Sequence, residues 1–311
     1  MKVAITGVSG YLGQLLLRRL AEEPAVESIL GLDAAPSAFQ SPKLTFEQAD
    51  VRTAPFAELF KGRDVVYHLA FIVEPRKNMR DAEVDEINIG GSERVFRGAA
   101  AAGVSKVIYS SSCAAYGAHP DNPAALTEDS PLRPNQNWYY SRTKGAVERF
   151  LDEFQQQHPA LIIIRFRPSI FLGPSINNSV AKLYHGRLLI SIDRTIKTDL
   201  CWDEDIVEAF FLALNYPRSD VFNLTGGGPL TMDEVGAILG RRVLHVGRPL
   251  ALGVTKLLCA LRLEPPGALE WIETGAAGPI LVSTERARER LGWQPRFDSA
   301  ATLRKYVDSL H

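Results

Sequence analysis

Residues 2–13 read KVAITGVSGYLG and join an apolar segment directly to a series of spaced glycines. The β-branched run Lys2–Thr6 predicts a buried strand. Gly7, Gly10 and Gly13 follow in a G-x-x-G-x-x-G spacing, at the point where a helical pattern begins. Glycines there let the backbone come close to a diphosphate, and the amides and dipole of the following helix favour its negative charge. Glycines alone would indicate only tight turns, but this context predicts a dinucleotide site.

An acidic residue supports the same interpretation. Asp33 ends the second predicted strand, twenty residues after Gly13, where a carboxylate can accept hydrogen bonds from the adenosine ribose hydroxyls. Its charge would repel a 2′-phosphate, and no Arg follows it directly, so NAD is favoured over NADP as the cofactor. Asp50 and Val51, at the end of the third predicted strand, are expected beside the adenine, although Asp50 alone could equally be a helix cap or a turn residue.

Short apolar runs alternate with helical patterns through the first half of the chain, which is typical of βαβ units around a parallel sheet. Their near-continuous hydrophobicity predicts strands that are covered on both faces. The predicted strands are Lys2–Thr6, Ser28–Asp33, Leu44–Ala49, Asp64–Ala70, Lys106–Ser112, Ala160–Arg165 and Val221–Thr225. One predicted helix covers Tyr11 to Glu23, and another runs from near Asp85 to Gly103. The fold class is therefore α/β, with a Rossmann-type doubly wound parallel sheet.

The alternation weakens after Gly173-Pro174. We therefore expect an NAD-binding Rossmann domain over residues 1–172 and a mainly substrate-binding region over residues 173–311, with residues 205–226 adding a late helix and strand to the first domain. The apolar segment Leu252–Leu263 could touch a membrane, but a packed or interface helix is the preferred interpretation.

Composition narrows the class of protein. The 311 residues are 46% hydrophobic and 23% charged, with a formal net charge of −1, so the chain is of ordinary globular composition and has no global field for nucleic acid or an anionic membrane. The three scattered cysteines form neither a disulfide framework nor a zinc motif. The first residues run directly into the predicted strand without the long apolar stretch of a signal peptide, so we expect none. We expect a cytoplasmic protein with a small-molecule substrate and no metal, nucleic-acid or membrane partner.

Tyr140 and Lys144 lie four residues apart, which places a phenol and an ammonium on one face of a helix. The pKa of the phenol would have to fall from near 10 to about 7 for it to act as a base near neutrality. A neighbouring Lys and an oxidised nicotinamide are positive charges that could lower it. The predicted strand Lys106–Ser112 ends in three serines, at the edge where parallel sheets bind ligands. Either motif alone would be weak evidence for a catalytic site, because both are common on protein surfaces.

Together these motifs resemble those of the extended short-chain dehydrogenases/reductases of the NAD-dependent epimerase/dehydratase family. The similarity extends over nearly the whole chain. The matching positions are Thr6–Gly13, Asp33, Asp50-Val51, His68–Ala70, Asn88, Ser110–Gly117, Tyr140 with Lys144, Arg167–Pro174, Asp205–Val207, Phe222–Gly227 and Leu291–Pro295.

The resemblance implies roles for individual residues. Ser112 would be the catalytic serine, and Tyr140 the acid/base. Lys144 would orient the ribose and lower the Tyr pKa, and Asn88 would hold its helix and a proton-relay water. The implied cofactor-binding residues are Gly7, Gly10, Tyr11, Leu12, Gly13, Asp33, Asp50, Val51, Leu69, Ala70, Tyr140, Lys144 and Arg167. A homodimer is also implied, and the Ala-rich stretch Phe96–Ala102 would permit its close packing.

The chain departs from the family pattern at two places, and these differences limit the reactions that the resemblance implies. Sugar-nucleotide 4,6-dehydratases carry an Asp-Glu pair directly after the catalytic hydroxyl residue, where this chain has Cys113 and Ala114. Nucleotide-sugar enzymes tend to have a longer insert after the Gly-Pro motif, whereas only 32 positions separate Gly173 from Asp205 here. Dehydration by that route is therefore not expected, and a large nucleotide-sugar substrate is disfavoured.

Three hypotheses about function stay open. The first is an NAD-dependent oxidoreductase acting on a secondary alcohol or ketone. The second is an NAD-dependent (sugar-nucleotide) epimerase with transient oxidation, and the third is a non-catalytic NAD-binding sensor. Such sensors typically lose the active tyrosine, so the presence of Ser112, Tyr140 and Lys144 together favours an enzyme.

Several other polar residues have simpler expected roles. His68 is expected to be a packed or backbone-bonded residue, and Tyr116 could line the pocket or belong to the core. Basic residues of the later region could hold a phosphate or carboxylate, but we expect them on the solvated surface. These are Arg187, Arg194, Lys197, Arg241, Arg242 and Arg248.

Overall fold

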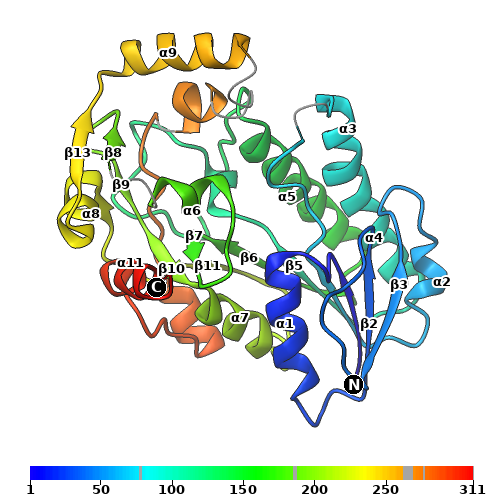
Figure 1. Ribbon diagram of the computed structural model, residues 1–311. Helices are drawn as coiled ribbons and strands as arrows, with labels where there is room; N and C mark the ends of the chain where they lie inside the picture. Colours follow the sequence, from blue (N-terminus) through cyan, green and yellow to red (C-terminus); the bar gives the residue numbers. More distant parts are fainter. Residues whose placement is uncertain (77–78, 185–187, 262–268, 276, 311) are drawn as a thin grey trace.

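A seven-stranded parallel sheet forms the centre of the computed structural model, which describes residues 1–76, 79–184, 188–261, 269–275 and 277–310. The strand order is β11-β6-β5-β4-β1-β2-β3, and helices lie on both faces (Figure 1). The strands are β1 (Lys2–Thr6), β2 (Ser28–Asp33), β3 (Leu44–Gln48), β4 (Val65–His68), β5 (Lys106–Ser110), β6 (Ile162–Pro168) and β11 (Asp220–Leu224). The predicted Rossmann-type α/β fold is confirmed.

Alternate residues of the strands face opposite layers of helices. Val3 and Ile5 of β1 pack with one layer, whereas Ala4 packs with the other. The first layer contains α1 (Tyr11–Ala21) and α7 (Asp203–Leu212). The second contains α2 (Phe56–Leu59), α4 (Gly91–Ala101) and α5 (Tyr139–Gln157). Two apolar cores therefore enclose the sheet.

The predicted strands all exist, but one expectation about them is wrong. β3 was expected to be covered on both faces, yet Thr45, Glu47 and Gln48 are exposed. The reason is that β3 is the edge strand, with β2 as its one neighbour in the sheet. β6 also begins at Ile162 and continues to Pro168, whereas the sequence predicted Ala160–Arg165.

The helix expected from near Asp85 to Gly103 consists of three pieces. These are α3 (Asp81–Asp85), the π-helix η1 (Glu86–Gly90) and α4. A π-helix contains a widened turn, and such turns frequently occur at functional sites. Here the turn contains Asn88, whose side chain is buried.

The chain after β6 builds small sheets and a third apolar core. β7 (Ile170–Leu172) pairs with β10 (Leu200–Trp202), β9 (Lys197–Thr198) with β12 (Leu230–Thr231), and β8 (Leu188–Ser191) with β13 (Arg242–His245). The other elements are η2 (Cys113–Tyr116), α6 (Ser179–Leu183), α8 (Met232–Leu239), α9 (Arg248–Ala260), η3 (Trp271–Gly275), η4 (Ala287–Leu291) and α11 (Ser299–Asp308). Arg187 and residues 262–263 of the apolar segment lie outside the described residues.

The stretch expected at a dimer interface is largely used inside the protein itself. Phe96 and Ala99 are fully buried in the core between α4, α5 and the sheet. The homodimer stays a prediction, and these two side chains are not available to it.

A buried ion cluster joins α5 to the sheet. The carboxylate of Glu148 accepts hydrogen bonds from Arg165 Nη1 at 2.9 Å, and from Arg167 Nε and Nη2, each at 2.9 Å. Burial by itself raises the pKa of Glu148, but Arg167 and Arg165 outweigh that effect and lower it to about 2. Since Glu148 lies one turn beyond Lys144 on α5, the cluster positions the helix that carries the candidate catalytic residues.

Glu148→Gln should lower the free energy of unfolding by about 3–5 kcal/mol, because two arginines would lose their buried counter-charge. The lowered pKa means that the carboxylate stabilises the fold above pH 4.5, its usual value, and that this contribution is lost as the pH falls toward 2. Urea unfolding between neutral pH and pH 2 measures both effects, and the variant should show less of the acid-dependent loss.

Asp152→Asn is the matched control. Asp152 also lies 2.7 Å from Arg165, but its side chain is 58% exposed, so its removal should cost about 0.5 kcal/mol or less. Equal effects of the two substitutions would contradict the central role of Glu148.

Candidate active site

The glycine turn lies at the carboxyl end of β1, against the loop that follows β4. Gly7 has a φ of +75°, and a Cβ on it would lie 2.4 Å from the Ala70 amide nitrogen. A Cβ on Gly13, in α1, would lie 2.1 Å from the Gly7 carbonyl oxygen. No side chain caps the start of α1 at Gly10, and its first turn holds no acidic residue. The turn therefore presents helix amides in the arrangement that binds phosphate.

Asp33 holds the same turn from the end of β2. Its Oδ2 accepts a hydrogen bond from the Ser9 amide at 3.0 Å, and its Oδ1 accepts one from the Ala35 amide at 3.1 Å. Each carboxylate oxygen has a further lone pair. Asp33 can therefore receive ribose hydroxyls while it orders the turn.

Other residues that were expected to bind the cofactor contact neighbouring side chains of the protein. Asp50 pairs with Arg52 at 2.6 Å, and their hydrogen bond lowers the Asp50 pKa. Val51 packs against Gly91 of α4. The Tyr11 hydroxyl donates to Asp203 Oδ2 at 2.5 Å, which links the glycine turn to α7. Two more residues, Leu69 and Leu12, pack against the core that contains α1 and α7.

α5 brings Tyr140 and Lys144 to the end of β5. Ser112 lies near enough to the Tyr140 phenol to lower its pKa, and Ser112 Oγ accepts the Ala114 amide at 3.1 Å. Lys144 Nζ donates to the Ser110 carbonyl oxygen at 2.7 Å and lies 5.8 Å from the centre of the Tyr140 ring. The structure thus places the three expected catalytic side chains together.

Burial has the largest effect on the pKa values of both Tyr140 and Lys144. Burial raises the pKa of Tyr140 to about 12, and the nearby Ser112 only partly opposes this rise in pKa. Burial also lowers the pKa of Lys144 well below its usual value, against the opposing charge of Glu148. Lys144 by itself therefore does not make the phenol acidic, because desolvation of the phenolate is the larger effect.

Sequence reasoning missed Phe71. Its ring lies edge-on to Tyr140 with centroids 6.0 Å apart, and Lys144 Nζ lies 3.4 Å from its centre. Asn88 fixes this loop, since its Oδ1 accepts the Ile72 amide at 2.7 Å and its Nδ2 donates to the Ile72 carbonyl at 3.0 Å. Phe71 directly follows an apolar strand in the sequence, so it has no local signal that separates it from a core residue.

Three other residues singled out in the sequence are structural. His68 is buried between Thr6 Oγ1, at 2.7 Å, and Ser92 Oγ, at 2.9 Å, and burial lowers its pKa to about 3. The packed role expected for His68 is confirmed. Tyr116 is buried, and its hydroxyl donates to the Thr127 carbonyl at 3.0 Å. Arg167 is buried with its guanidinium on Glu148 and on the Tyr116 hydroxyl, so it lies in the ion cluster rather than at the glycine turn.

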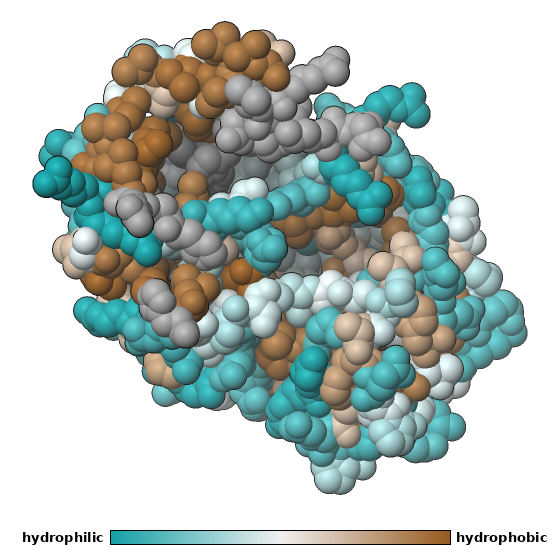
Figure 2. Space-filling view, viewed as in Figure 1, coloured by the Kyte–Doolittle hydropathy of each residue, from teal (hydrophilic) through white to brown (hydrophobic). Residues whose placement is uncertain are grey.

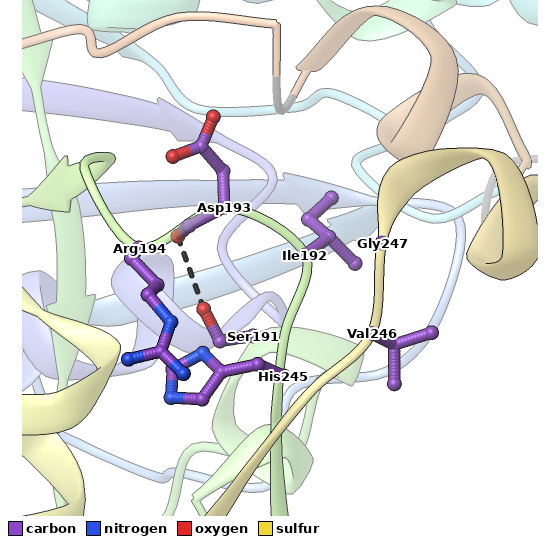
Figure 3. Close-up of a pocket in the computed structure, with 7 residues that line it drawn as sticks. All are labelled: Ser191, Ile192, Asp193, Arg194, His245, Val246 and Gly247. Atoms are coloured by element: carbon purple, nitrogen blue, oxygen red, sulfur yellow. Dashed lines mark hydrogen bonds between the residues drawn. The ribbon is translucent and has the colours of Figure 1, made fainter.

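A separate hollow of about 210 Å³ lies where β8 and β13 end (Figure 3). The Ser191 hydroxyl donates to the Asp193 carbonyl at 3.0 Å on its wall. Its lining residues are Ser191, Ile192, Asp193, Arg194, His245, Val246 and Gly247. None of the expected catalytic residues is among them, so this hollow is distinct from the Tyr140 site. Across the described ranges, no cluster of three or more His, Cys, Asp or Glu could hold a metal ion.

Comparisons with known proteins identify the family of the chain. A family model described as the NAD dependent epimerase/dehydratase family matches residues 3–225. The UDP-glucose 4-epimerase of Mycolicibacterium smegmatis is 28% identical, over 99% of this chain and 98% of that protein. A 3 beta-hydroxysteroid dehydrogenase/Delta 5-->4-isomerase of Mycobacterium tuberculosis is 24% identical, over 99% of this chain and 82% of that protein.

A solved structure shows the same fold. MoeE5, in complex with UDP-glucuronic acid and NAD, superposes with a TM-score of 0.78 at 20% identity, over 99% of this chain and 98% of that chain.

Gly13→Ala should lower the free energy of unfolding by about 1–3 kcal/mol, because the added methyl group would overlap the Gly7 carbonyl oxygen. Gly253→Ala is the control, since it lies in α9 with no heavy atom within 4 Å of its Cβ position. That change should stabilise the helix by about 0.5–1 kcal/mol. Urea unfolding of both variants measures the difference, and wild-type stability of Gly13→Ala would refute the close contact.

Proposed function

The chain belongs to the NAD-dependent epimerase/dehydratase family, and we propose that it is an NAD-dependent oxidoreductase that interconverts a secondary alcohol and a ketone. The observation that supports this most directly is the contact set at the end of β5. Ser112 lies near enough to Tyr140 to lower the pKa of its phenol, and Lys144 lies one helical turn further along α5. A phenol, a hydroxyl and a cation at a strand end can together hold a substrate oxygen and move its proton.

The glycine turn fits NAD. The close backbone contacts at Gly7 and Gly13 bring the start of α1 within reach of a diphosphate, and Asp33 offers its carboxylate to the adenosine ribose. When bound, NAD supplies the hydride acceptor or donor and, in its oxidised form, a positive charge. The carboxylate of Asp33 disfavours the 2′-phosphate of NADP by charge repulsion.

Tyr140 exchanges the proton of the substrate oxygen. During oxidation its phenolate accepts the hydroxyl proton, and during reduction its phenol donates a proton to the carbonyl oxygen. Ser112 donates a hydrogen bond to the same substrate oxygen. Lys144 adds the positive charge that opposes desolvation of the phenolate, and the Ser110 carbonyl holds its ammonium in place at 2.7 Å.

The surroundings of Tyr140 favour an apolar substrate over a nucleotide sugar. The rings of Phe71, Trp138 and Tyr139 lie with centroids between 6.0 and 6.4 Å from that of Tyr140. A diphosphate beside Tyr140 would need Arg or Lys side chains that are not already paired with carboxylates. Arg142 already pairs with Asp85 at 2.8 Å, and Arg167 is held by Glu148.

An NAD-dependent (sugar-nucleotide) epimerase is the second candidate. It is supported by the 28% identity to a UDP-glucose 4-epimerase over nearly the full length of both proteins. The same three side chains would then take the proton from one carbinol and return it after the carbon has been reduced on its other face. A non-catalytic sensor is the least supported hypothesis, because the chain contains Ser112, Tyr140 and Lys144 together.

Tyr140→Phe should lower turnover by about 10²–10⁴-fold, because it removes the group that moves the proton. NAD affinity, measured by calorimetry, should stay nearly unchanged. Tyr139→Phe is the matched control, since that hydroxyl donates to the Val73 carbonyl and should affect turnover far less. Wild-type-like turnover of Tyr140→Phe would refute the assignment of Tyr140.

Purified protein supplied with NAD and apolar secondary alcohols should accumulate NADH, measured by its absorbance. The oxidoreductase predicts this net change, since the hydride leaves with the cofactor in each turnover. No net absorbance change, together with scrambled stereochemistry at the carbinol carbon, would identify the epimerase instead.

A further inference from the structure

An exposed apolar stripe runs along α9. Leu250, Val254, Leu257 and Leu261 are each between 48% and 64% exposed. Their spacings of four, three and four residues place them on one side of the helix. The buried residues of α9 are Ala251 and Thr255, which lie on a different side. The packed helix expected at residues 252–263 therefore leaves Val254, Leu257 and Leu261 exposed to solvent, and Figure 2 shows hydrophobic surface over α9.

The small β8–β13 sheet extends this apolar surface. Leu188, Ile190 and Leu244 are each between 48% and 58% exposed. β8 and β13 pair in parallel with Ile190 opposite Leu244 and Leu188 opposite Arg242, so these side chains share one face. Seven of the ten large apolar side chains exposed in the described part of the chain lie on β8, β13 and α9 with its last turn. A cluster of exposed apolar side chains of this kind is typical of an interaction surface.

The charge of this surface is positive. Residues 235–261 contain four basic residues, Arg241, Arg242, Arg248 and Lys256, and no Asp or Glu. Arg248 and Lys256 lie on α9 and Arg242 on β13, while Arg194 lines the hollow beside the start of α9 (Figure 3). The acidic groups nearby are Asp193, beside Arg248; Asp233, 2.9 Å from His245; and Glu273, 3.4 Å from Lys256. The net charge of −1 for the whole chain hides this local excess.

We propose that the surface formed by α9 and the β8–β13 sheet docks on an anionic lipid bilayer. The apolar stripe would enter the boundary between headgroups and acyl chains, and the basic residues would meet anionic headgroups. Within the described ranges, no helix has the length and apolarity needed to cross a membrane.

Charge and shape favour a bilayer over a second copy of this chain or a partner helix as the occupant of this surface. A second copy of this chain in a two-fold interface would place the same positive surface, with Arg242, Arg248 and Lys256, on both sides of the contact, which is costly. A partner helix would require a groove, whereas α9 lies at the outer edge of the molecule (Figure 1). A protruding helix with an apolar stripe and basic neighbours is instead the form that lies in a bilayer surface.

The docking surface is connected to the helix that carries Tyr140. Arg248 Nη2 donates to the Glu273 carbonyl at 2.6 Å, which joins α9 to η3. Just before η3, Glu270 Oε2 accepts the Tyr139 amide at 3.1 Å. Docking would hold the start of α5 near the lipid phase, which suits an apolar substrate. This last point rests on the proposed function, whereas docking itself does not.

Vesicle co-sedimentation of the full chain tests the proposal. The probes are vesicles of phosphatidylcholine mixed with equal parts of phosphatidylglycerol, and vesicles of phosphatidylcholine alone. We expect binding to the anionic vesicles, binding at least about tenfold weaker to the neutral ones, and loss of binding at high salt.

Matched variants separate the apolar and basic contributions. Val254→Glu/Leu257→Glu should abolish binding to anionic vesicles, and Arg248→Gln/Lys256→Gln should weaken it by about 25-fold, roughly fivefold for each charge. Leu310→Glu changes an exposed leucine in the turn after α11 and should bind like the wild type. The replaced apolar side chains are about half exposed, so the variants should fold, which circular dichroism and urea unfolding would verify.

Absence of wild-type binding to anionic vesicles, or equal binding of wild type and Val254→Glu/Leu257→Glu, would overturn the proposal. A wild-type dimer that the same variant dissociates, without vesicle binding, would assign this surface to a second copy and overturn it as well. Light scattering after size-exclusion chromatography detects that dimer. None of these outcomes depends on Tyr140, so failure of docking and failure of the proposed function are distinguishable.

Discussion

The buried ion cluster of Glu148 with Arg165 and Arg167 is the interaction on which the site depends. A buried carboxylate is tolerated only while its counter-charges stay within hydrogen-bonding distance, because desolvation otherwise costs several kcal/mol. Glu148 therefore ties α5 to β6 in one position and rotation. Lys144 and Tyr140 lie one and two turns earlier on the same helix, so their placement at the end of β5 follows from this attachment.

Burial has opposite consequences for structure and for chemistry at this site. It stabilises the helix and sheet, yet it disfavours both the Tyr140 phenolate and the Lys144 ammonium. Glu148 opposes the effect on Lys144, and Ser112 opposes it on Tyr140. The polypeptide thus holds the phenol protonated, and an added positive charge would favour its ionised form.

The two halves of the chain are joined at the glycine turn and at the sheet edge. Tyr11 donates to Asp203 at the start of α7, and β11 returns the chain to the main sheet beside β6. The later elements then extend outward to α9, whose apolar stripe is exposed while η3 links it back to the start of α5. A surface and a reaction site that are far apart in sequence are therefore held in one structure.

Local sequence determined the elements and the candidate chemistry of this protein. Apolar runs predicted the strands, the glycine spacing and Asp33 predicted the dinucleotide turn, and the four-residue spacing predicted that Tyr140 and Lys144 share a helix face. Such signals depend on neighbours within a few residues. Only the tertiary structure decided that Phe71 contacts Lys144, that Arg167 pairs with Glu148, that burial raises the Tyr140 pKa, and that α9 leaves its leucines exposed. Those properties arise from desolvation and packing between segments that the chain brings together from distant positions.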